Sequence, residues 1–91
     1  MDITQSAIDS ILRQEDIEGL IESGAPGDEY SSEAENIASA LAGFTREQLT
    51  EDNIVEVLSS VWSRNFNLAQ ADIGQRLPAI RRVAAQIIYF C

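Results

Sequence analysis

Apolar residues recur three and four positions apart over most of the chain, which is the period of an amphipathic helix. The first such stretch predicts a helix over about residues 3–14, capped at its start by Asp2 or Thr4. Its apolar stripe consists of Ile3, Ala7, Ile8, Ile11 and Leu12. The same spacing continues over residues 17–21, but Gly19 interrupts it, so we expect only a short or frayed helical turn there.

A break in the pattern separates the first helix from the second. The Gly-Ala-Pro-Gly run at residues 24–27 cannot continue a helix, because proline lacks an amide hydrogen and Gly24 suits a left-handed backbone. We expect a structured loop there, followed by a helix that starts at Ser32, has capping-box spacing to Glu35, and ends at Gly43. Its apolar stripe consists of Ala34, Ile37, Ala38, Leu41 and Ala42. Because several of these residues are small, neighbouring helices can approach closely, and we expect this helix to be the central one.

Two further helices follow. The third starts at Thr45 or Thr50 and carries the strongest apolar stripe in the chain: Ile54, Val57, Leu58, Val61, Trp62 and Phe66. Residues 68–77 stay ambiguous, because Gly74 and Pro78 both weaken a continuous helix. Pro78 fits the first position of a last helix, where its missing N–H is no loss. The apolar positions of that helix are Leu77, Ile80, Ala84, Ile87, Ile88 and Cys91.

The predicted fold is all-α, a compact bundle of about four helices in a single domain spanning residues 1–91. No stretch has the sustained two-residue alternation of a strand, and no Asn-Gly or Asp-Gly hairpin turn occurs. Because the last helix is apolar on most sides, we expect Ile80, Ala84, Ile87 and Ile88 to be buried in the core or in a dimer interface.

The charge of the chain is strongly acidic and uneven. Fifteen Asp and Glu oppose six Arg, for a formal net charge of -9. Fourteen of the acids lie in residues 1–60, and four of the six Arg lie in residues 61–91. A field of this sign repels phosphate backbones and anionic lipid, so we expect neither a nucleic-acid partner nor a membrane partner. We expect Arg81 and Arg82 to pair with the acidic N-terminal part of the chain.

The residue types also restrict the chemistry. The chain has no His and no Lys, which removes Ser-His and Cys-His nucleophile pairs, Schiff-base chemistry and the phosphate-loop lysine. We therefore expect no enzyme activity and no cofactor. No register of the acids matches a calcium-binding loop, so no metal site is predicted. The lone Cys91, the lack of a signal-peptide pattern and the lack of a span of about 20 apolar residues favour a cytoplasmic protein without a membrane anchor.

Eight acids and no base lie between Glu15 and Glu35, which is typical of a solvated face or of a docking surface for a basic partner. The candidate binding residues are Asp16, Glu18, Glu22, Asp28, Glu29, Tyr30 and Glu33. Asp28 has a structural alternative, in which it caps or braces the turn before the second helix. We expect Tyr30 to be a half-buried plug over the core with its OH in water, the alternative being an exposed contact residue.

One segment carries a resemblance to a known family. The motif residues are Ile17-Glu18-Gly19-Leu20-Ile21, Gly24-Ala25-Pro26-Gly27-Asp28-Glu29-Tyr30, Glu33-Ala34 and Ile37. This pattern resembles the YugE-like domain of unknown function, a family of short all-helical bacterial proteins with a Gly-Ala-Pro, Asp-Glu-Tyr motif ahead of a helix. The resemblance implies a helical fold and a bacterial cytoplasmic origin, with no activity attached. Related small acidic proteins occur among immunity proteins that neutralise toxins.

Three classes of function remain. The first is a non-catalytic interaction module whose acidic face, from Glu15 to Glu35, docks a basic protein partner. The second is a homo-oligomeric structural protein, such as a homodimer, assembled through the apolar last helix. A cation-binding protein is a third alternative. The sequence names no partner.

Overall fold

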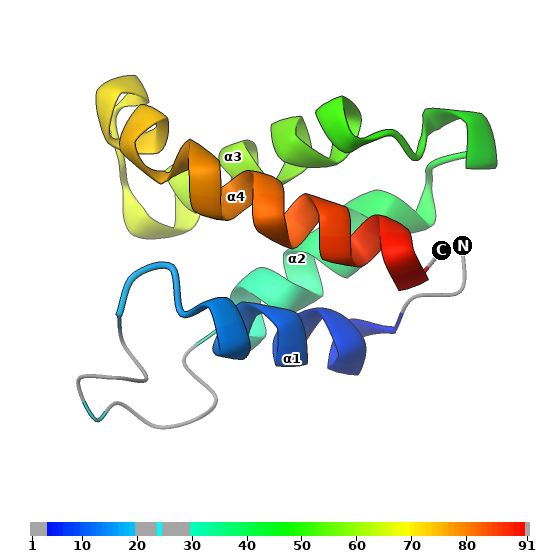
Figure 1. Cartoon of the computed structure of the whole chain (residues 1–91), viewed down its shortest axis with the longest axis horizontal. Helices are drawn as coiled ribbons and strands as arrows, with labels where there is room; N and C mark the ends of the chain where they lie inside the picture. Colours follow the sequence, from blue (N-terminus) through cyan, green and yellow to red (C-terminus); the bar gives the residue numbers. More distant parts are fainter. Residues whose placement is uncertain (1–3, 20–23, 25–29, 91) are drawn as a thin grey trace.

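The computed structural model describes residues 4–19, 24 and 30–90. Its helices are α1 (Gln5–Glu15), α2 (Ser31–Ala42), α3 (Glu51–Phe66) and α4 (Gln70–Phe90), with a short 3₁₀ helix η1 (Arg46–Gln48) between α2 and α3 (Figure 1). No strand occurs within the described residues. The prediction of an all-α bundle of about four helices is confirmed.

The four helices pack as a ring in which each contacts two neighbours. α1 packs on α2, α2 on α3, α3 on α4, and α4 on α1. Figure 1 shows α1 and α4 side by side in front of α2. The expectation that the second helix is central was wrong. The reason is that its small-residue stripe is only partly inward: Ala34 is buried, but Ala42 at the end of the stripe is exposed.

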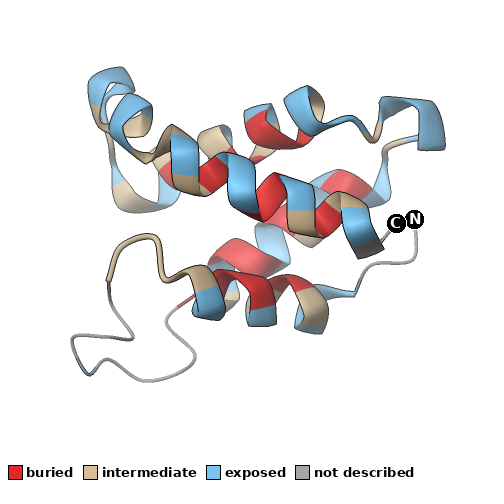
Figure 2. Cartoon of the chain, viewed as in Figure 1, coloured by how far each residue is buried: buried red, intermediate tan, exposed pale blue. Residues whose placement is uncertain are grey.

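The core lies inside this ring, on the inward faces of all four helices (Figure 2). Trp62 and Tyr30 are its largest fully buried side chains. Phe66 is partly buried and packs on Trp62, with ring centroids 5.1 Å apart. The core of the described residues consists of Ile8, Ile11, Leu12, Tyr30, Ala34, Ile37, Leu41, Ile54, Val55, Leu58, Val61, Trp62, Ile80, Val83, Ala84 and Ile87. Of the α4 residues predicted to be buried, Ile80, Ala84 and Ile87 lie in the chain's own core, and Ile88 is partly buried against it.

Threonine side chains cap the N-termini of three helices. Thr4 caps α1 by accepting a hydrogen bond from the Ala7 N–H. Both candidates for the third helix start are used, since Thr45 caps η1 and Thr50 caps α3. The start of α2 differs: its N-cap is Tyr30, which makes no side-chain capping bond, so the predicted Ser32 capping box was wrong. The predicted end at Gly43 is confirmed.

The last helix begins eight residues before its predicted start, because Pro78 lies inside α4 rather than at its first position. The start of α4 is stabilised by Asp72, whose carboxylate accepts a hydrogen bond from the Ala69 N–H at 3.1 Å. A proline inside a helix costs about 3 kcal/mol. Ile73 and Leu77, in the turns before Pro78, pack against the core and offset this cost.

Gly19 and Gly74, which both weaken the predicted helical pattern, differ in backbone conformation. This difference yields a stability prediction. Gly74 is helical and a Cβ there would meet nothing within 4 Å. Gly74→Ala should therefore stabilise the protein by about 0.5–1 kcal/mol, because alanine restricts the unfolded chain and favours a helix. Gly19 has a φ of 68°. Gly19→Ala should instead cost about 1 kcal/mol, because an L side chain is strained there. Urea unfolding of both variants checks the pair, and stabilisation by both would contradict the assigned backbone.

Candidate functional site

The turn after α1 brings two of the predicted site residues toward the bundle. Asp16 ends α1 in the left-handed conformation, and its N–H donates to the Leu12 carbonyl at 2.8 Å. The Gly19 N–H then donates back to the Asp16 carbonyl at 2.9 Å. Residues 17–19 thus form a turn rather than a continuation of the helix. This turn holds the side chains of Asp16 and Glu18 where α3, α4 and the start of α2 can contact them.

Tyr30 ties the start of α2 to this turn. Its hydroxyl donates to the Asp16 Oδ1 at 2.7 Å and accepts from the Glu18 N–H at 3.1 Å. The residue has 0% of its surface exposed. The prediction that Tyr30 is half buried with its OH in water was therefore wrong. A phenol can be buried without penalty when its hydroxyl finds partners, and Asp16 and Glu18 supply them here.

The Glu18 carboxylate joins three elements. It accepts from Arg76 of α4 through Nε, and through Nη2 at 3.0 Å, so that the ion pair is bidentate. It also accepts from the Trp62 Nε1 of α3 at 3.3 Å. The Glu18 side chain is 12% exposed and the Arg76 side chain 26%. We refer to Asp16, Glu18, Tyr30, Trp62 and Arg76 as the turn network.

Arg76 remains a cation in this setting. Its hydrogen bonds to Glu18 raise its pKa above the ordinary value, and the charges of Glu18 and Asp72 add to this against the opposing effect of burial. Its Nη1 also donates to the Asp72 carbonyl at 2.9 Å. The Glu18 carboxylate thus stabilises the charged form of Arg76.

Aromatic stacking continues the turn network into the core. The rings of Tyr30 and Trp62 are stacked, with centroids 6.0 Å apart and an angle of 20° between their planes. Tyr30 and Trp62 are thus held in place both by their polar bonds to the turn after α1 and by contact between their rings. Trp62 belongs to the core, as predicted, but its indole N–H also holds Glu18, which no helical pattern indicates.

The predicted site residues therefore do not form one outward acidic face. Asp16, Glu18 and Tyr30 make contacts within the protein, and Glu33 in the first turn of α2 is buried, with 5% exposed. Gly24 has the expected positive φ, at 96°. Three of the predicted binding residues lie outside the described residues, namely Glu22, Asp28 and Glu29. A docking role for the segment stays a prediction.

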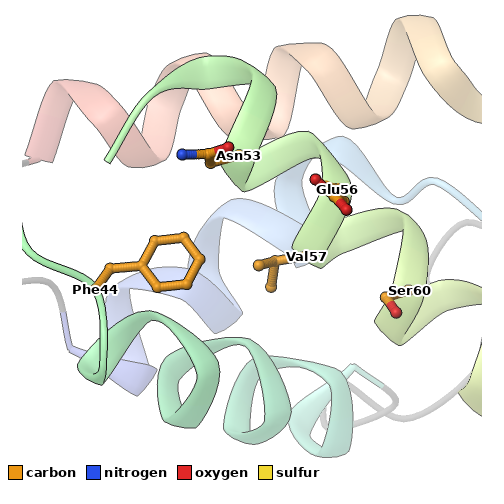
Figure 3. A pocket seen from close by; sticks show the side chains of 5 residues that line it. All are labelled: Phe44, Asn53, Glu56, Val57 and Ser60. Carbon is orange, nitrogen blue, oxygen red and sulfur yellow. The ribbon is translucent and has the colours of Figure 1, made fainter. Parts of the chain in front are cut away.

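A groove runs between α2 and α3 on the outside of the ring. Its first part is a pocket of about 340 Å³ in which the Phe44 ring, from the end of α2, faces Val57 of α3 (Figure 3). Its second part, about 350 Å³, adjoins the first and shares Val57 and Ser60 with it. The lining residues of both parts together are Asn36, Ser39, Ala40, Phe44, Asn53, Glu56, Val57, Ser60, Val61 and Arg64. We call this surface the α2/α3 groove.

The α2/α3 groove has an apolar floor and an opposite charge at each end. Phe44 and Val57 are partly buried, so each still offers apolar surface. Glu56 lines the part next to Phe44, and Arg64 lines the other part. A hydrogen bond of 3.5 Å from Asn36 to Asn65 joins α2 to α3 near the Arg64 end.

Sequence reasoning missed this groove. Val57 was assigned to the core stripe of the third helix, although it lies at the edge of that stripe and Val55 is the buried residue. Phe44 lies in the connection after α2, where no period applies. The available signal was a large apolar residue directly after the predicted helix end at Gly43, ahead of a polar segment.

A further pocket, of about 580 Å³, lies between α3 and the first turns of α4. Ile73 and Leu77 supply its apolar surface, and Glu56 is its one charged lining residue. Within the described residues, no group of three or more His, Cys, Asp or Glu is placed to hold a metal ion. In that same part of the chain, none of the helices has the length and apolar character needed to cross a membrane.

No family model, no curated protein and no solved structure matches this chain. The resemblance to the YugE-like domain is therefore untested and stays a hypothesis.

The turn network predicts a large difference between two ion pairs. Glu18→Gln should destabilise the protein by about 2–3 kcal/mol, because it leaves the partly buried Arg76 without its counter-charge. The matched control is Arg81→Gln, which breaks the exposed pairs with Glu51 and Asp52. That variant should lose about 0.5 kcal/mol or less. Chemical denaturation followed by circular dichroism measures both, and equal losses would contradict the network.

Tyr30 allows its ring and its hydroxyl to be separated. Tyr30→Phe removes the bonds to Asp16 and to the Glu18 N–H, and should cost about 1.5–3 kcal/mol. Tyr30→Ala also removes the buried ring, and should cost about 3–5 kcal/mol. An exposed recognition residue would lose no more than about 0.5 kcal/mol on either change. Unfolding free energies of the two variants therefore decide between a structural and a contact role.

Proposed function

We propose that this protein is a non-catalytic module that binds a protein partner with a basic surface, and that the α2/α3 groove is its docking surface. The observation that carries the proposal is a groove with an apolar floor, open to solvent at an acidic end of the molecule. Exposed acids gather in η1 and the first half of α3, namely Glu47, Glu51, Asp52 and Glu56. Such a combination supports protein recognition, in which apolar contact supplies affinity and charge supplies steering.

Two bases, Arg46 of η1 and Arg81 of α4, offset only part of the charge of these four acids. Arg81 pairs with Glu51 at 3.4 Å and with Asp52 at 3.6 Å, through side chains that are largely exposed. Glu47 and Glu56 make no ion pair within the described residues. The net charge of -9 adds a long-range attraction for a cationic partner.

The residue types at the groove favour binding over catalysis. Its hydroxyl groups come from Ser39 and Ser60, and a serine needs an adjacent base to become a nucleophile. The chain has neither imidazole nor amine side chains to act as that base.

The alternative of a homo-oligomer assembled through the last helix has less support. It rested on the apolar character of that helix, which the chain's own core accounts for through Ile80, Val83, Ala84 and Ile87. Among the described residues, Tyr89 is the one large apolar side chain that is exposed.

Charge neutralisation at the groove tests the proposed function. Wild-type protein and the double variant Glu47→Gln/Glu56→Gln serve as baits for proteins of the native host. The partner that wild type retains should associate with the variant several-fold more slowly, and with a weaker dependence on salt, because steering charges act mainly on the association rate.

Two control variants locate the effect. Glu35→Gln removes an exposed acid of α2 that does not line the groove, and should leave binding unchanged. Asp28→Asn/Glu29→Gln tests the segment that the sequence favours. Loss of binding in either control, with normal binding by the groove variant, would move the docking surface away from the groove. Binding that is insensitive to salt in all of them would contradict a basic partner.

A further inference from the structure

We propose that the α2/α3 groove holds about two turns of an amphipathic helix of the partner, with a basic side chain beside Glu56 and an acidic side chain beside Arg64. This inference rests on the proposed function, and it adds the structural class and the charge pattern of the segment that is recognised.

The length of the groove fits a short helical segment. Along α2 and its end, the lining residues run from Asn36 to Phe44, which corresponds to about 12 Å at a helical rise of 1.5 Å per residue. Val57 and Val61 lie one turn apart in the groove. Two apolar side chains at the same i, i+4 spacing on a partner helix can therefore pack between Phe44, Val57 and Val61.

The walls of the groove allow the backbone of a helix to approach closely. Its middle is lined by the small side chains of Ser39, Ala40 and Ser60. Distances between packed helix axes fall to the lower end of their range when the residues at the contact are small. The large apolar side chains, Phe44 and Val57, lie on the floor of the groove. They can contact only the apolar face of a bound helix, which makes the surface selective for an amphipathic segment.

A peptide that binds as a strand finds no sheet edge at this surface. Peptides that bind as strands pair their backbone with the free edge of a sheet. The described part of the chain has no strand, and both sides of the groove are helices whose backbone groups bond within the helix. A helix satisfies its own backbone groups, so it needs only side-chain contacts here.

Charge determines which helix fits. Glu56, Ser60 and Arg64 lie four residues apart on α3 and form one ridge along the groove. Glu56 and Arg64 are exposed, and neither makes an ion pair within the described residues. The groove therefore has one anionic and one cationic end about 12 Å apart, by the same helical rise. A segment with one basic and one acidic end complements both.

Three designed helices test this pattern on three forms of the protein. Each peptide has about 16 residues, an alanine background, a Leu pair at i, i+4, and a hydrocarbon staple on the opposite face, so that all three are equally helical. The first carries Lys at one end and Glu at the other, the second carries Lys at both ends, and the third Glu at both ends. The proteins are wild type, Glu56→Arg and Arg64→Glu, whose changes are at exposed positions.

Each protein should prefer a different peptide. Wild type should prefer the Lys/Glu helix, Glu56→Arg the Glu/Glu helix, and Arg64→Glu the Lys/Lys helix. Each mismatch should weaken the Kd about three- to fivefold, as for a single exposed charge pair. Replacing the Leu pair by Ala should abolish binding to all three proteins. Kd values come from fluorescence anisotropy, and amide chemical shifts locate the site.

The outcome separates this inference from the proposed function. Matched preferences together with shifts confined to α2, α3 and Phe44 support the inference. Equal binding of all peptides, no binding, or shifts centred on α1 or α4 would overturn it. If the helices fail while the captured partner still depends on Glu47 and Glu56, the docking function stands without a helical ligand. If the helices follow the predicted pattern while no basic partner is retained, only the proposed function fails.

Discussion

The packing of the turn after α1 on α3 and α4 depends on the hydrogen bonds that the Glu18 carboxylate accepts. This carboxylate lies in a turn without helical support, yet it accepts hydrogen bonds from Trp62 of α3 and from Arg76 of α4. Removing an anion from water costs several kcal/mol unless donors replace the water. Three donor groups do so here, and the same bonds join the turn after α1 to both α3 and α4. Removing one partner is therefore costly, because it leaves a partly buried charge without its counter-charge.

The acids of this chain thus have two different uses. Asp16 and Glu18 contribute to folding, through the hydroxyl of Tyr30 and the guanidinium of Arg76. Glu47 and Glu56 are exposed and make no ion pair within the described residues. A net charge alone does not distinguish these uses. What distinguishes them is whether the turn geometry directs a carboxylate toward donors on another helix.

The helices and most of the core were predictable because they depend on local information. Periodic apolar positions such as Ile54, Leu58 and Trp62 must face inward wherever the helix packs. The start of α4 was not predictable in the same way, because tertiary packing of Ile73 and Leu77 overrides the local cost of Pro78. The candidate site depends on tertiary structure even more. The α2/α3 groove exists only once two helices lie together, and the docking role of the acidic segment is still a prediction.

The partners in the turn network are far apart along the chain, and this has a consequence for how the protein is made. Glu18 and Arg76 are 58 residues apart, and Glu18 and Trp62 are 44 apart. Closing loops of this size costs chain entropy before any bond rewards it. During synthesis, α1 and the turn after it are made long before Arg76, whose guanidinium pairs with Glu18. Until then, Glu18 lacks its counter-charge, so the final closure of the bundle awaits the synthesis of α4.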